Sequence, residues 1–191
     1  MPYFILHITL QGTTNPVVWR TVQLPASISF YKLHKVIQTA FGWKEMHLHA
    51  FELPAHPGVV ITHPDYVDDD DREIIDEKNA KLKDYLHAAG ESLRYVYDFG
   101  DDWQHIITVV QVLWKWRVDN RNIFLAAEGR CPPEDIGGPP GFARFKETIA
   151  DKHHPEYRHY KDWMAFTGEK EFNPWDVGLE RKVIQFMGGR L

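Results

Sequence analysis

Residues 92–114 read SLRYVYDFGDDWQHIITVVQVLW, and this stretch decides the fold. Apolar residues recur in two strand-like runs on either side of a short polar segment in which Gly100 stands among aspartates. Apolar runs bounded by turn signals are typical of strands, and glycine with Asx residues is the usual composition of a tight connection. The stretch therefore predicts an antiparallel hairpin whose strands are Ser92 to Asp98 and Gln104 to Trp114.

The connection in this hairpin carries more chemistry than a turn needs. Between Tyr97 and His105 the chain places three carboxylates, an imidazole and three aromatic side chains. A tight turn requires only a glycine and one or two Asx residues, so the surplus groups mark a candidate ligand site. A structural interpretation stays open, in which one aspartate accepts backbone N–H bonds and Trp103 packs into the core.

A helix and a second hairpin complete the predicted core. Ser29 is a suitable N-cap, apolar residues after it recur at helical spacing, and Gly42 follows, which predicts a helix over 29–41. Residues 3–10 and 17–24 alternate like strands. The prediction is an α+β fold: a roll-like antiparallel sheet with one long packed helix and a C-terminal helical segment.

Length and composition favour a single α+β domain over 1–191, because 191 residues with 43% hydrophobic content can bury one full core. The sheet and helix core is expected over 1–128, an irregular loop over 129–141, and helices over 142–191. We call residues 129–141 the Pro/Gly loop. The N-terminus shows no signal or membrane span, and Cys131 is the single cysteine, so we expect a cytoplasmic protein without a disulfide.

Charge is unevenly distributed around a net value of −5. Residues 65–77 hold eight acidic side chains against Arg72, which predicts a solvated, mobile acidic loop. The run Asp68 to Asp71 would offer oxygen ligands to a divalent cation, but it lacks the glycine and the distant glutamate of a calcium loop.

Basic residues gather in the C-terminal helical segment. They are Arg130, Arg144, Lys146, Lys152, Arg158 and Lys161, with His153, His154 and His159. Acidic residues are interleaved with them, so a solvated helix face is favoured over a phosphate-binding footprint. A nucleic-acid-associated protein that uses these helices remains an alternative, although the chain as a whole lacks a basic footprint.

His47 and His49 form a candidate metal site. One residue separates them on a presumed strand, so both imidazoles are expected on one face. Imidazole nitrogens suit zinc, and His105 is a candidate for a third nitrogen ligand. Further ligand candidates are Asp101, Glu134, Asp135 and Cys131. The competing interpretation makes one histidine exposed and the other a hydrogen-bonded part of the core.

Cys131 lies at the start of the Pro/Gly loop, in GRCPPED over 129–135. A cysteine nucleophile needs a neighbouring base, for which His105 is the candidate, whereas a small packed cysteine is the commoner case. Glu134 and Asp135 follow in a rigid loop of the kind that often lines clefts.

Five strings run through the chain in order: NPVVWR (15–20), LHKVIQTAFGW (33–43), HLHAFEL (47–53), YVYDFGDDWQH (95–105) and GRCPPEDIGGPPGF (129–142). On these strings nearly the whole chain resembles the plasmid ORF-three-like family, first named from a root-inducing plasmid. The resemblance implies an α+β roll with a C-terminal helical part, and it implies no established activity. The acidic insert and the stretch from Trp114 to Asn122 match least well.

The function predicted from these observations is an accessory binding domain for a small ligand or a protein partner. Its polar and aromatic cleft is expected between residues 95–105 and 129–142. The candidate cleft residues are Tyr97, Asp98, Asp101, Asp102, Trp103, His105, Glu134 and Asp135. The alternative is a metal-dependent hydrolase-like enzyme that uses His47, His49, Asp101 and His105, with zinc as the candidate metal.

Overall fold

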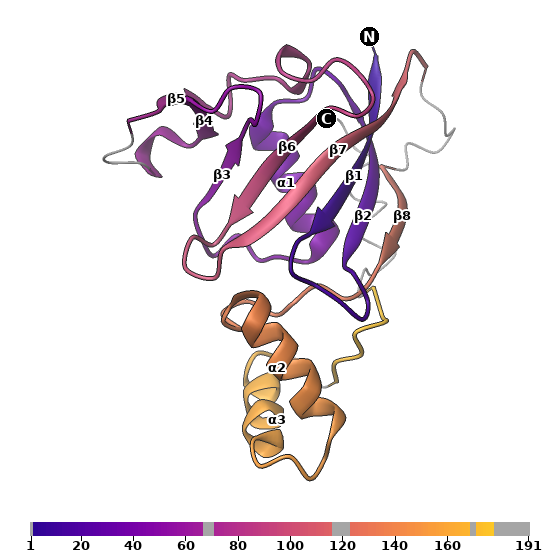
Figure 1. The fold of residues 1–191 in the computed structure, drawn as a ribbon, viewed down its shortest axis with the longest axis vertical. Helices are drawn as coiled ribbons and strands as arrows, with labels where there is room; N and C mark the ends of the chain where they lie inside the picture. Colours follow the sequence, from indigo (N-terminus) through magenta and orange to yellow (C-terminus); the bar gives the residue numbers. More distant parts are fainter. Residues whose placement is uncertain (1, 67–70, 116–122, 169–170, 178–191) are drawn as a thin grey trace.

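The computed structural model describes residues 2–66, 71–115, 123–168 and 171–177. Within these residues eight strands form one sheet in the order β5-β4-β3-β6-β7-β1-β2-β8. The strands are β1 (Tyr3–Leu10), β2 (Trp19–Pro25), β3 (His49–Glu52), β4 (Val59–Thr62), β5 (Glu73–Asp76), β6 (Ser92–Tyr97), β7 (Trp103–Leu113) and β8 (Phe124–Glu128). The helices are α1 (Phe30–Phe41), α2 (Gly138–Ala150) and α3 (Tyr157–Phe166). Helix α1 lies against one face of the sheet, and α2 and α3 lie together beyond one end of the strands (Figure 1).

The hairpin predicted over 92–114 is confirmed. Strands β6 and β7 pair antiparallel, with Tyr97 opposite Trp103 and Tyr95 opposite His105. These four side chains are fully buried on the face that α1 covers. Asp98 and Asp102 have φ angles of 57° and 53°, a left-handed backbone that Asp tolerates better than most residues.

The predicted helix is also confirmed, as α1. The Ser29 side chain accepts a hydrogen bond from the Lys32 amide, and Gly42 ends the helix with a φ of 88°. Leu33 and Ile37 from its apolar stripe are fully buried against the sheet. Burial of such a side chain stabilises the fold by about 1.5–3 kcal/mol. The α+β class predicted from sequence is therefore correct.

The acidic stretch 65–77 is only partly a loop. Residues Glu73–Asp76 form β5, which pairs parallel with β4 at the edge of the sheet, and Glu77 is buried. The loop prediction is wrong here because the apolar side chains of Ile74 and Ile75 favour a strand beside β4. The acidic residues around them disfavour pairing of this exposed edge with another chain. Asp68 to Asp70, the main part of the candidate chelating run, lie outside the described residues.

The Pro/Gly loop is irregular only as far as Gly137. Helix α2 begins at Gly138, inside the range predicted as loop, since Pro139 and Pro140 occupy its first turn, where an N–H is not needed. Helices α2 and α3 confirm the helical character predicted after residue 142, and residues 178–191 lie outside the described part of the chain. No helix among the described residues is both long and apolar enough to cross a membrane.

Candidate functional site

Two loops meet at the end of the sheet nearest α2. They are the β6–β7 turn, residues 98–102, and the Pro/Gly loop. The Asp101 carboxylate accepts a hydrogen bond of 3.0 Å from the Gly137 amide. The Tyr97 hydroxyl, at the start of the turn, donates one of 3.0 Å to Oε1 of Glu134. Direct bonds therefore hold the two segments against each other.

Glu134 is the most buried carboxylate at this junction, with a side chain only 7% exposed. Its Oε1 accepts hydrogen bonds from the Lys44 amide at 2.6 Å and from the Tyr97 hydroxyl. Its Oε2 has no hydrogen-bond partner among the described residues. Burial raises the pKa of Glu134 above its usual range, against the opposing effect of these donors.

His47 projects toward this carboxylate. Its Nε2 lies 3.1 Å from Oδ1 of Asp135, 3.5 Å from Oδ2 of Asp98 and 3.8 Å from Oε2 of Glu134. Nevertheless Nε2 is buried and makes no hydrogen bond among the described residues. One imidazole nitrogen is thus surrounded by three carboxylate oxygens.

The backbone holds the two outer aspartates in place. Asp98 and Asp135 have φ angles of 57° and 58°. Oδ1 of Asp98 accepts hydrogen bonds from the amides of Gly100 at 3.0 Å and Asp101 at 3.3 Å, which leaves Oδ2 facing His47. His47, Asp98 and Asp135 each offer one ligand atom, all within 4.8 Å of one another. A nitrogen and two oxygens in this arrangement could hold a divalent metal ion.

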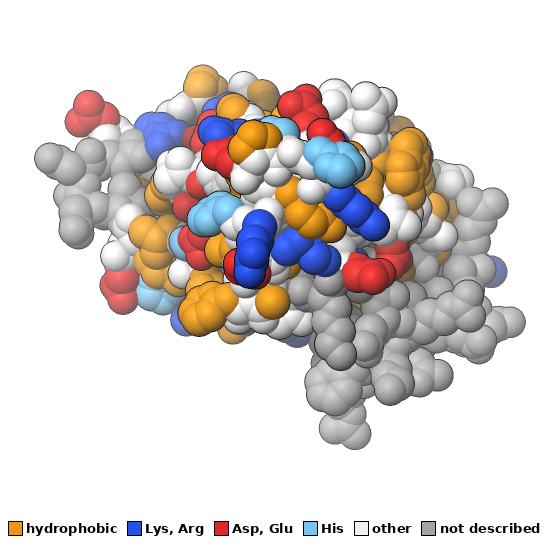
Figure 2. All heavy atoms as spheres, turned by 90° about the horizontal axis from the view of Figure 1, so that it is seen from below, with side chains coloured by type: hydrophobic (Ala, Val, Ile, Leu, Met, Phe, Trp, Pro, Cys, Tyr) orange, Lys and Arg blue, Asp and Glu red, His pale blue; other side chains and the backbone are white. Residues whose placement is uncertain are grey.

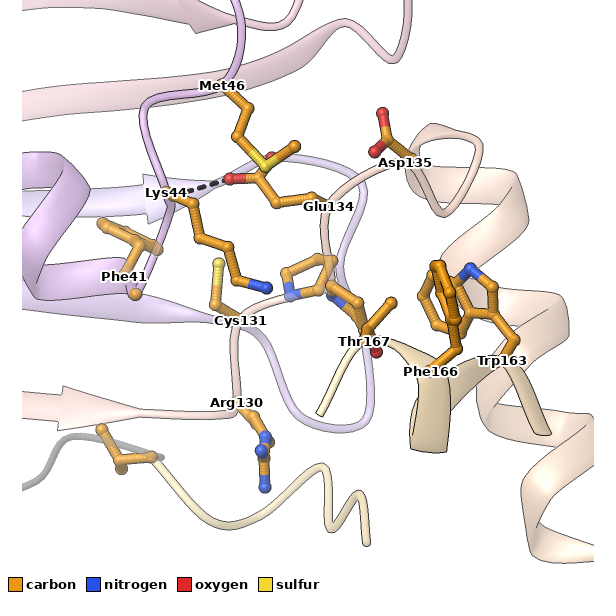
Figure 3. Close-up of a pocket in the computed structure, with 14 residues that line it drawn as sticks. Phe41, Lys44, Met46, Arg130, Cys131, Glu134, Asp135, Trp163, Phe166 and Thr167 are labelled. Atoms are coloured by element: carbon orange, nitrogen blue, oxygen red, sulfur yellow. Dashed lines mark hydrogen bonds between the residues drawn. The ribbon is translucent and has the colours of Figure 1, made fainter. Parts of the chain in front are cut away.

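A cavity of about 360 Å³ opens beside Glu134 and Asp135. Met46 and Lys44 line it from the segment after α1, and Trp163 and Phe166 line it from α3 (Figure 3). Met46 and Phe166 are 59% and 92% exposed. The cavity therefore has apolar walls that are open to solvent and a carboxylate cluster at one side.

The comparisons with known proteins fit this fold. Residues 2–181 match the family described as plasmid pRiA4b ORF-3-like protein. The chain belongs to this family. It is 33% identical over 161 residues, 84% of this chain and 79% of the other, to the uncharacterized protein y4hQ of Sinorhizobium fredii. It is similar, with a TM-score of 0.77 and 30% identity, to the crystal structure of a protein of unknown function, MM3350 from Methanosarcina mazei, covering 92% of this chain and 94% of that chain. The resemblance drawn from the five strings is confirmed.

In this family member His49 and His105 lie apart from the carboxylate cluster. Nε2 of His49 is 2.7 Å from a Glu77 carboxylate oxygen. Nε2 of His105 accepts a hydrogen bond of 3.3 Å from the Trp43 indole, and its Nδ1 lies 3.1 Å from the Trp103 carbonyl oxygen. Burial lowers the pKa of His105 to about 3. The structure does not assemble the zinc ligand set predicted from His47, His49 and His105, because His47 precedes β3 and strand alternation does not apply to it.

Two further cleft candidates also lie elsewhere. Trp103 is fully buried in the core and presents no surface to a ligand. The Asp102 carboxylate accepts a hydrogen bond of 2.7 Å from the side-chain amide of Gln104 and lines a separate hollow with Arg94. Of the predicted residues, the structure groups Tyr97, Asp98, Asp101, Glu134 and Asp135.

Cys131 lines the cavity as a buried residue, 8% exposed. Burial raises the pKa of its thiol well above the usual range, more than the nearby Arg20 lowers it. A nucleophile requires the thiolate, which this environment disfavours. The position is that of a packed structural cysteine.

The sequence analysis missed Arg20, which holds the first residue of the Pro/Gly loop in place. Its buried guanidinium donates to the carbonyl oxygens of Ala40 at 2.6 Å, Glu128 at 2.8 Å and Gly129 at 3.0 Å. It thereby joins the end of α1 to the start of the Pro/Gly loop. The sequence did indicate that Arg20 is buried, because side chains alternate between the two faces of a strand and Arg20 lies two residues from both Val18 and Val22, which are buried.

The basic residues of α2 and α3 do not form a uniform patch. Arg144 is bonded to Glu156 at 2.6 Å, and Arg158 lies 4.0 Å from Asp162. Figure 2 views this end of the molecule and shows acidic, basic and hydrophobic side chains interspersed. The solvated-face interpretation accounts for these residues better than a phosphate-binding footprint.

Proposed function

We propose that this protein is a single α+β binding domain, and that a small ligand occupies the cavity between the Pro/Gly loop and α3. The observation that carries the proposal is that Glu134, which lines this cavity, has a buried carboxylate oxygen, Oε2, without a hydrogen-bond partner among the described residues. Leaving such a group unsatisfied costs about 1–3 kcal/mol or more. A ligand that supplies a donor or a cation would therefore bind more favourably by about that amount.

The other walls suit the body of an organic ligand. Met46, Trp163 and Phe166 offer apolar surface, and the lining also includes the cationic side chains of Lys44 and Arg130. Small-molecule sites commonly combine apolar walls with a few convergent polar groups. The proposed ligand therefore has an apolar part against α3 and a polar part at Glu134.

A hydrolase-like enzyme is not proposed in the form drawn from the sequence. That form required His47, His49, Asp101 and His105 at one centre, and His105 is enclosed in the core with both ring nitrogens occupied. A nucleic-acid-binding role for the C-terminal helices is not favoured either, since two of their arginines are engaged by acidic neighbours.

A matched pair of exposed phenylalanines tests the proposal. A library of small organic fragments would be screened by saturation-transfer NMR against the wild type, Phe166→Asp and Phe99→Asp. Phe166 lines the cavity and is 92% exposed, whereas Phe99 is 48% exposed and lines a different hollow. We expect fragments that bind the wild type and Phe99→Asp but not Phe166→Asp. An absence of fragments, or equal binding by both variants, would refute the proposal.

A further inference from the structure

The carboxylate cluster around His47 has the composition and spacing of a metal centre. We infer that His47, Asp98 and Asp135, assisted by Glu134, bind a divalent first-row transition metal ion such as Zn²⁺ at the mouth of the cavity. This metal site rests on the proposed function in one respect only: we assign the ion a part in holding the proposed ligand. This set differs from the three histidines predicted from the sequence.

The distances from His47 to the two aspartates match those between ligands of one ion. Two ligand atoms bound at about 2.1 Å lie about 3.0 Å apart at a right angle and about 3.4 Å apart at the tetrahedral angle. Nε2 of His47 is 3.1 Å from the Asp135 oxygen and 3.5 Å from the Asp98 oxygen. All three ligand atoms lie within 4.8 Å of one another, so side-chain movements of less than about 2 Å would bring them around one ion.

The unsatisfied atoms provide independent support. Nε2 of His47 and Oε2 of Glu134 are both buried, lie 3.8 Å apart, and have no hydrogen-bond partner among the described residues. The Glu134 side chain is more than nine-tenths buried, and Oε1 is fixed by Lys44 and Tyr97, so Oε2 is aimed into the cluster. Buried polar atoms without partners are uncommon, and a bound ion is one of their ordinary explanations.

The chemistry of the donors selects the kind of ion. Mg²⁺ and Ca²⁺ prefer sites built entirely of oxygen, whereas zinc and its neighbours accept imidazole nitrogen together with carboxylate oxygen. Three carboxylates close to one imidazole also concentrate negative charge, which a divalent ion would offset. These donors favour Zn²⁺ over Mg²⁺ and Ca²⁺.

The position of the cluster leaves one side of the ion accessible. The Asp135 side chain is 61% exposed and that of His47 is 25% exposed, and both Glu134 and Asp135 line the cavity. Metal sites that act on ligands keep a coordination position open to water or to the bound molecule. The ion would therefore bind the polar end of the proposed ligand.

Titration with the metal alone tests the site. Protein purified without a histidine tag and dialysed against a chelator would be titrated calorimetrically with Zn²⁺, Mg²⁺ and Ca²⁺, and with Co²⁺ while visible absorption is recorded. We expect about one equivalent of Zn²⁺ to bind, and Mg²⁺ and Ca²⁺ to bind much more weakly. Bound Co²⁺ should show ligand-field absorption bands. His47→Ala and Asp135→Asn should weaken Zn²⁺ by at least the roughly 10- to 100-fold that loss of an outer-sphere partner costs.

His63→Ala is the matched control. His63 has a similarly exposed side chain, 29%, and lies 3.8 Å from Asp65 at a site away from the cluster. It should bind Zn²⁺ like the wild type. Because Asp135 is largely exposed, Asp135→Asn keeps the test valid if His47→Ala fails to fold. Absence of Zn²⁺ binding, or unchanged affinity in Asp135→Asn, would overturn the metal site. If fragments still bind the wild type in that case, and Phe166→Asp abolishes their binding, the proposed ligand cavity remains supported although the metal site is not.

Discussion

The imidazole rings of His34, on α1, and His49, on β3, stack in the core with centroids 3.6 Å apart and planes 5° apart. Nδ1 of His34 lies 2.8 Å from the Tyr95 hydroxyl. Desolvation, with smaller contributions from His49 and Lys35, lowers the pKa of His34 to about 2. The packing of α1 on the sheet therefore depends on a neutral His34.

We predict that the free energy of unfolding falls as the pH is lowered from 7 to 5. The pKa of His34, about 2, and that of His105, about 3, both lie below the value of about 6.5 in an unfolded chain. The unfolded state takes up protons first, so stability present above pH 6.5 is lost below it. Each histidine should cost about 2 kcal/mol by pH 5, measured by urea unfolding at pH 7, 6 and 5.

Substitutions separate this effect from general acid sensitivity. His34→Gln should reduce the slope of stability against pH, while His153→Gln, at an exposed position, should leave it unchanged. Glu134 acts in the opposite direction, since a raised carboxyl pKa favours the folded state as the pH falls. A slope that is the same in His34→Gln and the wild type would contradict the assignment to His34.

Trp103→Ala should destabilise the protein by about 3–5 kcal/mol. The Trp103 ring is fully buried, with its centroid 5.6 Å from that of Trp43 and 6.5 Å from that of Phe142 on α2. Trp114, which is 78% exposed, supplies the control, and Trp114→Ala should change stability by only about 0.5 kcal/mol. Similar shifts in the urea midpoints of the two variants would contradict this account of Trp103.

Arg20→Ala should cost about 3–5 kcal/mol, because it removes the donor that Arg20 supplies to several buried carbonyl oxygens. Burial lowers the pKa of Arg20 to about 10, so it remains charged at neutral pH. Arg20→Lys should recover little of the loss, since an ammonium group cannot reproduce the forked geometry toward Ala40 and Glu128. The exposed Arg158 provides the comparison, and urea midpoints for Arg158→Ala should match those of the wild type.

Local signals were sufficient to predict the central elements of the fold. The cap at Ser29, the stop at Gly42 and the aspartates around Gly100 each act within a few residues, so the sequence alone identifies the helix and the hairpin. Edge strand β5 was not predicted, because Ile74 and Ile75 become a strand only when β4 is beside them.

The candidate site depended on contacts that sequence spacing does not encode. Asp98, Glu134 and Asp135 were identified from the composition of two loops, and the structure places these loops in contact. The partner of His47 could not be read from its neighbour His49, because a strand boundary falls between the two residues. Trp163, on α3, could not be predicted as a cavity residue from the sequence. Its place in the cavity depends on how α3 packs against the Pro/Gly loop, which is a tertiary contact.

Cys131 should react slowly with a chromogenic disulfide reagent in the folded protein. Its thiol is buried and its pKa is raised, so the reactive thiolate is scarce. The chain has a single cysteine, so unfolding in urea should release one equivalent at a much higher rate. A native rate close to the unfolded rate would show that the cavity exposes this thiol and would restore a chemical role for it.

Gly138→Ala should cost more stability than Gly90→Ala. Both glycines have a left-handed backbone, with φ of 68° and 93°. Alanine in this conformation lowers the free energy of unfolding by about 1–2 kcal/mol at either position. At Gly138 a Cβ would also lie 2.5 Å from the Asp101 carbonyl oxygen, whereas at Gly90 it would meet no atom within 4 Å. Relieving that contact requires the β6–β7 turn to move away from the Pro/Gly loop, at an additional cost of about 1–3 kcal/mol. Urea unfolding of the two variants measures the difference, and equal losses would show that the two loops can separate freely.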